Sequence, residues 1–236
     1  MNLFNQKLCR ERIARFDFPT GEKATRIEKI ISGWQYALKD RDLSKTKEKS
    51  IQGSFLIKFF EEVLGYTSQT SGKGEWNLIQ HPASEVDAQE PDGSLGFFTN
   101  EEKLTKAVIE LKDAKTLLDK KQTGREKGYT PIEQAYLYAT KFDRCNWIIV
   151  SNFREIRLYN KNRTQDFFEK FDVLELHGIT PLTGEKAQAT LRGRPRGRLG
   201  TAGSGNGRLR GRPRRFGSTQ GEGATLYVNN SATLQM

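Results

Sequence analysis

Residues 106–112 read KAVIELK, and this stretch decides the expected fold. Its centre is apolar except for one glutamate, a pattern typical of a buried β-strand. Because side chains alternate between the two sides of a strand, Val108, Glu110 and Lys112 are predicted to share one face. The alternate apolar residues then form the other face, and a glutamate and a lysine are expected side by side.

The segments around this stretch predict the other elements of an α/β protein. Strands are predicted at residues 94–98, after the turn signal Pro91-Asp92-Gly93, at 145–151 (CNWIIVS) and at 154–159 (REIRLY). A helix is predicted from Pro131 to about residue 142, with Thr130 as its cap and Glu133 at its positive end.

Two amphipathic helices are predicted before the strands. Residues 24–38 carry apolar side chains three, four and seven apart, and a second apolar stripe runs from Ile51 to a cap at Gly65. The polar run 39–50 is predicted to be a solvated connection, and 66–90 a loop with one short extended piece. This order of elements predicts a three-layer α/β sandwich on a small mixed sheet, with N-terminal helices.

The charge divides the chain near residue 182. Of the formal charge of +10, residues 183–236 carry +8, from nine arginines and one lysine against two acids. Such a segment buries too little apolar surface to offset the entropy of ordering it, so a disordered basic tail is predicted. Residues 1–182 are predicted to form one domain, with helices within 24–65 and a core at 91–160.

Composition excludes several classes of protein. The chain has no apolar run long enough to span a membrane, and its first residues lack the apolar stretch of a secretory signal. Two cysteines, Cys9 and Cys145, exclude a disulfide framework and a cysteine zinc site. Neither His81 nor His177 has a partner at metal-ligand spacing. A cytoplasmic protein with no membrane partner is therefore expected.

The candidate chemistry lies in Asp92, Glu110 and Lys112. Two carboxylates suit Mg²⁺, which prefers oxygen ligands, and a nearby lysine suits the water or the developing charge of phosphodiester hydrolysis. The pattern acid-x-Lys occurs four times, but only this copy lies in an apolar strand behind a Pro-Asp turn. The alternative is an ordinary surface ion pair on an edge strand.

Further polar residues accompany these three. Gln134 and Tyr138 lie four apart on the predicted helix and therefore point the same way, which suits orientation of a carboxylate or phosphate, or ordinary packing. Downstream donors that suit DNA phosphates are Ser151, Asn152, Arg154 and Arg157. Arginines of an alternating strand also suit a plain solvated face.

The stretch from 91 to 159 resembles a known family. The words PDGSLGFF, KAVIELKDAKTLLDK, TPIEQAYLYATKF and CNWIIVSNFREIRLY are similar to the N-terminal nuclease region of single-chain type IIG restriction–modification enzymes, in which an endonuclease is fused to an adenine-N6 DNA methyltransferase. The resemblance implies a PD-(D/E)xK restriction-endonuclease-like fold and Mg²⁺-dependent cleavage of double-stranded DNA.

The same resemblance implies roles for particular residues. Asp92 and Glu110 would be metal ligands, and Lys112 would activate the water. Gln134, with Tyr138, would match the Gln-x-x-x-Tyr helix motif of related nucleases. Asp87 is the rival for the first acid, but it lies further from the apolar strand, so Asp92 is preferred.

The sequence departs from the family after residues 171–179. No glycine-rich S-adenosylmethionine motif and no Pro-Pro-containing motif is present, so the methyltransferase and target-recognition regions are missing from this chain. The tail repeats LRGRPR at 191–196 and 209–214, which resembles an AT-hook core or a non-native, frame-shifted end. The alternative function is therefore a non-cleaving DNA-binding fragment that uses the basic tail.

Overall fold

A computed structural model of the chain describes residues 2–40, 43–46, 48–72, 74–84, 86–123 and 128–176. These residues belong to one of two units of the chain, and the other unit, Thr180–Glu222, lies wholly outside them. The predicted basic tail and His177 also lie outside the described residues. The predicted domain boundary at 182 therefore stays a prediction. No helix within the described ranges is long and apolar enough to cross a membrane.

Helices precede the sheet. They are α1 (Gln6–Ile13), α2 (Gly21–Asp40), the short 3₁₀ helix η1 (Leu43–Lys45), α3 (Glu48–Phe55) and its π-helical continuation η2 (Leu56–Val63). The two predicted helices are confirmed, and Gly65 ends the second with a φ of 82°. The solvated connection predicted at 39–50 is wrong in part, because α3 begins within it and Leu43 is buried.

Six strands form one mixed sheet in sequence order. They are β1 (Trp76–Gln80), β2 (Gly93–Phe98), β3 (Lys103–Leu111), β4 (Trp147–Ser151), β5 (Glu155–Asn160) and β6 (Phe168–Asp172). Neighbours are antiparallel except β3 and β4, which run parallel. Helix α4 (Pro131–Thr140) makes the crossover between these two strands, as parallel pairing requires. Short 3₁₀ turns η3 (Gln69–Ser71) and η5 (Val173–Glu175) complete the elements.

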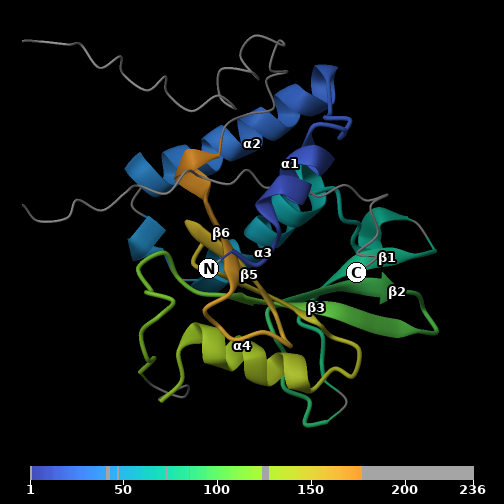
Figure 1. Ribbon diagram of the computed structural model, residues 1–236, viewed down its shortest axis with the longest axis vertical. Coiled ribbons are helices and arrows are strands. Elements are labelled where there is room, and N and C mark those ends of the chain that lie inside the picture. Colours follow the sequence, from blue (N-terminus) through green and yellow to red (C-terminus); the bar gives the residue numbers. More distant parts are fainter. Residues whose placement is uncertain are drawn as a thin grey trace, which may run out of the picture. The chain divides into compact units, whose positions relative to one another are not determined.

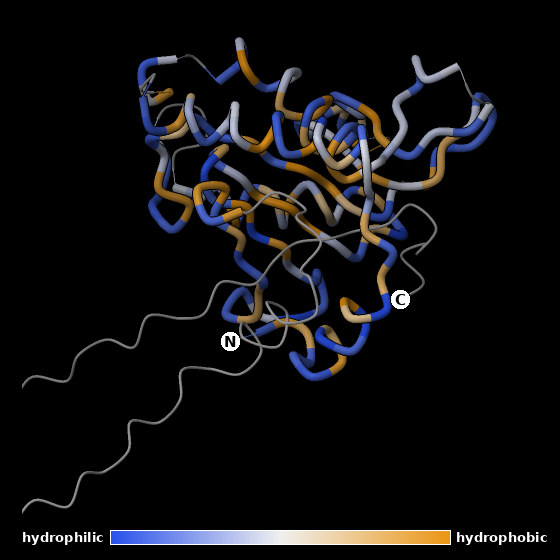
Figure 2. Tube along the Cα trace, turned by 90° about the horizontal axis from the view of Figure 1, so that it is seen from above, coloured by the Kyte–Doolittle hydropathy of each residue, from blue (hydrophilic) through white to orange (hydrophobic). Residues whose placement is uncertain are grey.

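The sheet separates two apolar layers, which confirms the expected α/β sandwich (Figure 1). Helices α2 and α3 with η2 cover one face, where Phe55 and Phe59 pack on Ile109. Helix α4 covers the other face, where Ala135 packs with Val108. The alternation predicted for β3 is therefore confirmed, and Figure 2 shows hydrophobic segments running through the middle of the domain.

The start of helix α4 follows the sequence closely. The Thr130 hydroxyl accepts a hydrogen bond from the Glu133 backbone N–H, and the Glu133 carboxylate accepts one from the Thr130 N–H. This reciprocal capping box satisfies two backbone donors that a helix start otherwise leaves without a partner. Pro131 takes the first helical turn as predicted.

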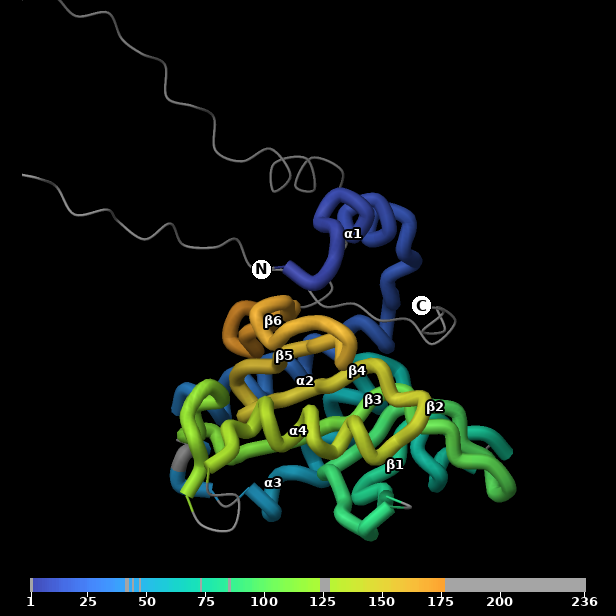
Figure 3. The backbone as a smooth tube through the Cα atoms, turned by 60° about the horizontal axis from the view of Figure 1, so that its bottom comes forward, coloured from blue at the N-terminus to red at the C-terminus, as the bar shows by residue number. Residues whose placement is uncertain are grey.

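Two elements were not predicted from the sequence, helix α1 and strand β6. Helix α1 buries no residue, so it leaves little apolar periodicity to detect, although Asn5 caps its first turn. Strand β6 reads FEKFD and carries Glu169, which is buried and accepts a hydrogen bond from the Phe4 N–H at 2.9 Å. The N-terminal segment therefore attaches beside β6, with α1 lying beyond that edge (Figure 3).

Gly96 in β2 marks the closest backbone approach among the glycines of the described residues. A Cβ at this position would lie 2.0 Å from the Leu104 carbonyl oxygen, at the point where the β2–β3 register shifts. Gly96→Ala is therefore expected to lower the free energy of unfolding by about 3 kcal/mol, measured by chemical denaturation.

Gly33→Ala is the matched control, because no atom lies within 4 Å of its added Cβ and the residue is exposed within α2. It should raise the free energy of unfolding by roughly 0.5–1 kcal/mol, since alanine is the better helix former. Equal effects of the two substitutions would contradict the close approach at Gly96.

Candidate active site

The candidate site lies where strands β2 and β3 meet at one end of the sheet. Gly93 pairs with Ile109, so Asp92, just before β2, comes level with the end of β3. There the Asp92 carboxylate accepts a hydrogen bond from the Leu111 N–H at 2.5 Å. This hydrogen bond holds the Asp92 carboxylate against the backbone of β3, at the residue between Glu110 and Lys112.

Glu110 and Lys112 form a largely buried ion pair. Their Oε1 and Nζ atoms are 2.7 Å apart, and the side chains are 4% and 13% exposed, respectively. Strand β3 is third of the six strands, so it is not an edge strand. The alternative of an ordinary surface ion pair on an edge strand is therefore wrong.

Burial dominates the protonation of this cluster. Burial and, to a smaller extent, the nearby Asp92 raise the pKa of Glu110, Lys112 lowers it, and the net result is a pKa of about 8. Burial also raises the pKa of Asp92, although the Leu111 N–H and Lys112 lower it. For Lys112, burial favours the neutral amine, but the carboxylates of Glu110, Glu48 and Asp92 together raise the pKa.

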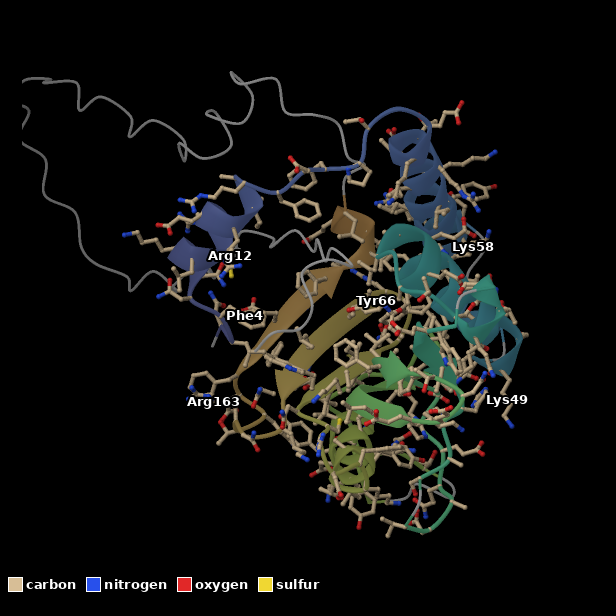
Figure 4. All side chains as sticks on the ribbon, turned by 90° about the vertical axis from the view of Figure 1, so that its right-hand side faces the viewer. Phe4, Arg12, Lys49, Lys58, Tyr66 and Arg163 are labelled. Atoms are coloured by element: carbon tan, nitrogen blue, oxygen red, sulfur yellow. The ribbon has the colours of Figure 1, made fainter. Side chains whose placement is uncertain are left out.

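Glu48 is a site residue that the sequence analysis missed. It is the first residue of α3 and is half-buried, and burial raises its pKa while Lys112 lowers it and Asp92 raises it. Its neighbour Lys49 is exposed on the outside of the helix (Figure 4). Acidic residues are common at helix starts, where the helix dipole stabilises their negative charge. The sequence therefore contains no sign that Glu48 belongs to a functional site.

Gln52 follows Glu48 by one turn of α3 and was also missed. Its side chain is only 5% exposed and lies close enough to Asp92 to lower the pKa of that acid. Its Nε2 has no hydrogen-bond partner among the described residues. A buried amide donor without a well-placed acceptor is costly, and next to the Asp92 carboxylate it suits a bound water or a phosphate oxygen.

Gln134 and Tyr138 meet on helix α4, as their spacing predicts. The Gln134 amide donates to the Tyr138 hydroxyl at 3.2 Å and accepts from the Gln122 amide at 2.8 Å. Gln134 is buried on α4, the helix that packs on the face of the sheet where Val108 lies. The helix is thereby joined to the loop that follows Lys112.

Asp87, the rival first acid, lies in a different environment. Its carboxylate accepts from the Lys141 amine at 2.7 Å and from the Ser84 hydroxyl at 2.8 Å, and these hydrogen bonds lower its pKa. Asp87 is exposed and ties the loop before Asp92 to the end of α4. The structure therefore brings Asp92, rather than Asp87, to Glu110 and Lys112.

The two arginines predicted to contact DNA differ in their surroundings. Arg154 is 57% exposed and lies 3.3 Å from the Asp172 carboxylate. Arg157 is buried, and its two terminal nitrogens each lie 2.7 Å from an oxygen of Asp119. Arg157 also donates to Glu155, so its guanidinium is already occupied by two carboxylates.

The other predicted donors, Ser151 and Asn152, serve the turn between β4 and β5. The Ser151 hydroxyl accepts from the Phe153 N–H, and the side-chain oxygen Oδ1 of Asn152 accepts from the Glu155 N–H. The Asn152 amide donates to the Thr116 carbonyl at 2.9 Å. These contacts explain why Phe153 tolerates a φ of 67°, because the turn around it is fixed on both sides.

The remaining minor predictions concern cysteine and histidine. Cys145 is buried, and burial raises the pKa of its thiol, as expected for an unreactive residue. His81 is exposed and its backbone N–H donates to the Asp92 carbonyl oxygen. Among the described residues, no group of three or more histidine, cysteine, aspartate or glutamate side chains is arranged to hold a metal ion.

Comparison with known proteins identifies the family. The family model described as "MmeI, N-terminal domain" matches residues 22–192. The chain belongs to this family, the N-terminal domain of type IIG restriction–modification enzymes, and the resemblance found in the sequence is confirmed.

The other comparisons add little. Among solved structures, a cryo-EM structure of a DrdV–DNA complex is 18% identical to this chain, with a TM-score of 0.36. The match covers 62% of this chain and 12% of that chain. None of the curated proteins matches the chain. The family assignment therefore rests on the family model.

The raised pKa of Glu110 predicts how stability varies with pH in the absence of metal. Between about pH 4.5 and 8 the folded state holds a proton that the unfolded state releases, so the free energy of unfolding falls as pH rises through that window. Glu110→Gln removes this dependence. At about 1.4 kcal/mol per pH unit, the fall from pH 5 to pH 9 should shrink by an amount on the order of 4 kcal/mol.

Urea denaturation in EDTA at several pH values measures this difference. Glu101→Gln is the control, because Glu101 is exposed and its replacement should leave the pH profile unchanged. A Glu110→Gln profile parallel to that of the wild type would show that Glu110 titrates normally.

Proposed function

We propose that the chain is a Mg²⁺-dependent DNA endonuclease module that hydrolyses phosphodiester bonds as part of a restriction–modification system. Membership of the family supports a role in such a system. The observation that carries the proposal is the charge imbalance at the site: the Lys112 amine pairs with Glu110, Asp92 is bonded to the Leu111 N–H between them, and Glu48 acts on the same amine, so three acids accompany one lysine. Buried carboxylates in excess are costly unless a proton or a cation neutralises them.

The donor set fits Mg²⁺. Carboxylate oxygens are the ligands that this ion prefers, and Asp92 and Glu110 are proposed to hold it, with Glu48 acting through a bound water. Two carboxylates suffice because Mg²⁺ usually keeps several waters. A bound Mg²⁺ would polarise the phosphate and lower the pKa of a coordinated water.

Lys112 is proposed to orient the attacking water and to steady the charge that develops on the phosphate. Its amine lies 2.7 Å from Glu110 and is held protonated by the surrounding acids, so it supplies a fixed positive charge in a mostly buried position. Water attacks phosphorus, the bond to the 3′ oxygen breaks, and a 5′-phosphate and a 3′-hydroxyl remain. These roles define a site of the PD-(D/E)xK type.

Gln134, Tyr138 and the arginines are proposed to support this site. The hydrogen-bonded pair of Gln134 and Tyr138 would orient a phosphate or the adjoining backbone. Arg154, which is more than half exposed, suits contact with a DNA phosphate. A DNA contact by Arg157 requires one of its carboxylate partners to be released, so the geometry favours Arg154 for that role.

The proposed partners follow from the reaction. Double-stranded DNA is the substrate, and methyltransferase and target-recognition regions outside this chain would select the sequence to be cut. A cytoplasmic location accords with two free cysteines, because that compartment keeps thiols reduced.

Plasmid nicking tests the site. Asp92→Ala, Glu110→Gln and Lys112→Ala are each expected to lower the Mg²⁺-dependent nicking rate by roughly 100-fold or more, because each removes a group that acts on the reacting phosphate or its ligands. EDTA should abolish nicking by the wild type.

Asp87→Ala is the control, because this acid is bonded to Lys141 in an exposed loop. Its activity should remain within a few-fold of the wild type. Full activity in Asp92→Ala or Lys112→Ala would refute the assignment of the site, and loss in Asp87→Ala alone would make Asp87 the first acid.

The second candidate function is DNA binding without cleavage through the basic tail, which the charge of +8 in residues 183–236 favours. Deleting these residues is then expected to abolish most binding to duplex DNA, because arginine–phosphate contacts release counterions. The slope of log affinity against log salt should become smaller in magnitude by several units, as measured by fluorescence anisotropy. Unaltered binding after the deletion would exclude this function.

A further inference from the structure

The loop that leaves the candidate site carries a group of exposed lysines. We name residues 113–123 the lysine loop; it follows Lys112 directly and contains Lys115, Lys120 and Lys121, all exposed. It has no helix or strand of its own. Its first residue, Asp113, also influences Glu48, so the loop begins inside the carboxylate cluster.

Side chains from three other elements fasten the lysine loop. Arg157 of β5 donates two hydrogen bonds, each of 2.7 Å, to the Asp119 carboxylate. Asn152, after β4, donates to the Thr116 carbonyl at 2.9 Å. Gln134 of α4 accepts from the Gln122 amide at 2.8 Å. The loop is therefore held along its length, at positions 116, 119 and 122.

The loop is also ordered from within. The Thr116 hydroxyl donates to the Asp113 carboxylate at 2.7 Å, and the Lys120 N–H donates to the Leu117 carbonyl at 3.0 Å. Leu118 is only 2% exposed and packs in the apolar layer beneath α4. An irregular segment with this many fixed points keeps its outward side chains on a defined surface.

The charge that this surface presents is positive. Asp119 is neutralised by Arg157, which is the main cause of its lowered pKa, and Asp113 accepts from Thr116 and lies 3.9 Å from the Lys115 amine. Within the described ranges, no acid lies at salt-bridge distance from Lys120 or Lys121. Arg157 and Lys170 together balance Asp119 and Glu155, so the acid beside the two lysines is already paired and their charges stay available.

We propose that the lysine loop is a preorganised contact for the DNA backbone, in which Lys120 and Lys121 bind phosphates flanking the phosphodiester held at Glu110 and Lys112. This inference rests on the proposed nuclease function and adds to it the surface that positions the substrate. Ammonium groups bind phosphates as point charges and read no base sequence. Because the loop is already fixed, binding costs little ordering entropy.

The double variant Lys120→Gln/Lys121→Gln tests this contact in the full chain. Affinity for a 30-base-pair duplex is measured by fluorescence anisotropy at several salt concentrations, with Ca²⁺ in place of Mg²⁺. Binding should weaken about tenfold or more at 0.1 M salt, and the slope of log affinity against log salt should fall by about 1.8, since two phosphate contacts are lost.

Lys23→Gln/Lys29→Gln is the matched control, because it removes the same charge from exposed positions of α2, on the opposite face of the sheet. Its slope should stay within a few tenths of the wild-type slope. Equal slopes for the two double variants would overturn the proposal.

Lysine acetylation, read by mass spectrometry with and without duplex DNA, provides a second measurement that needs no variant. Lys120 and Lys121 should be protected by DNA several-fold more than Lys23 and Lys29. Protection that is equal at all four lysines would overturn the loop contact while leaving the nuclease proposal untouched. If DNA protects the loop lysines but the protein does not nick DNA, the nuclease proposal is wrong and the loop contact stands.

Discussion

The hydrogen bond from the Leu111 N–H to the Asp92 carboxylate joins the two strands on which the candidate site depends. It fixes an acid from the start of β2 against the end of β3, where Glu110 and Lys112 are already paired. Putting these charges into a mostly buried position costs free energy, and one lysine cannot neutralise the surrounding acids. The cluster is therefore a place where binding a proton or a cation is favourable, and the raised pKa of Glu110 expresses this directly.

The topology explains why polar residues from many elements gather at this end of the sheet. Strands β3 and β4 run parallel, so Lys112 and Ser151 leave the sheet side by side, with the Lys112 N–H bonded to the Ser151 carbonyl. In open α/β sheets the carboxyl ends of parallel strands are the usual place for ligands. In the crossover, Gln134 of α4 accepts a hydrogen bond from Gln122 in the loop after Lys112, and α3 brings Glu48 and Gln52 to the site.

Much of this arrangement was accessible from the sequence. Local sequence patterns predicted four features correctly: strand β3, its alternating faces, helix α4 with its cap, and the pairing of Gln134 with Tyr138. Helix α1 and strand β6 escaped because neither carries a clear apolar period. Glu48 and Gln52 escaped because they lie about sixty residues before Glu110 in the chain, on an element whose polar residues resemble an ordinary helix start.

By itself, the sequence determined strands β2 to β5, helices α2 and α4, and which face of β3 carries its acid and its lysine, because these depend on the spacing of neighbouring residues. Only the tertiary structure decided which distant groups share one environment. It separated Asp92 from its rival Asp87, bound Arg157 to Asp119 and buried the Glu110–Lys112 pair. The physical reason is that burial and charge proximity are properties of the folded chain, and both depend on contacts between residues far apart in sequence.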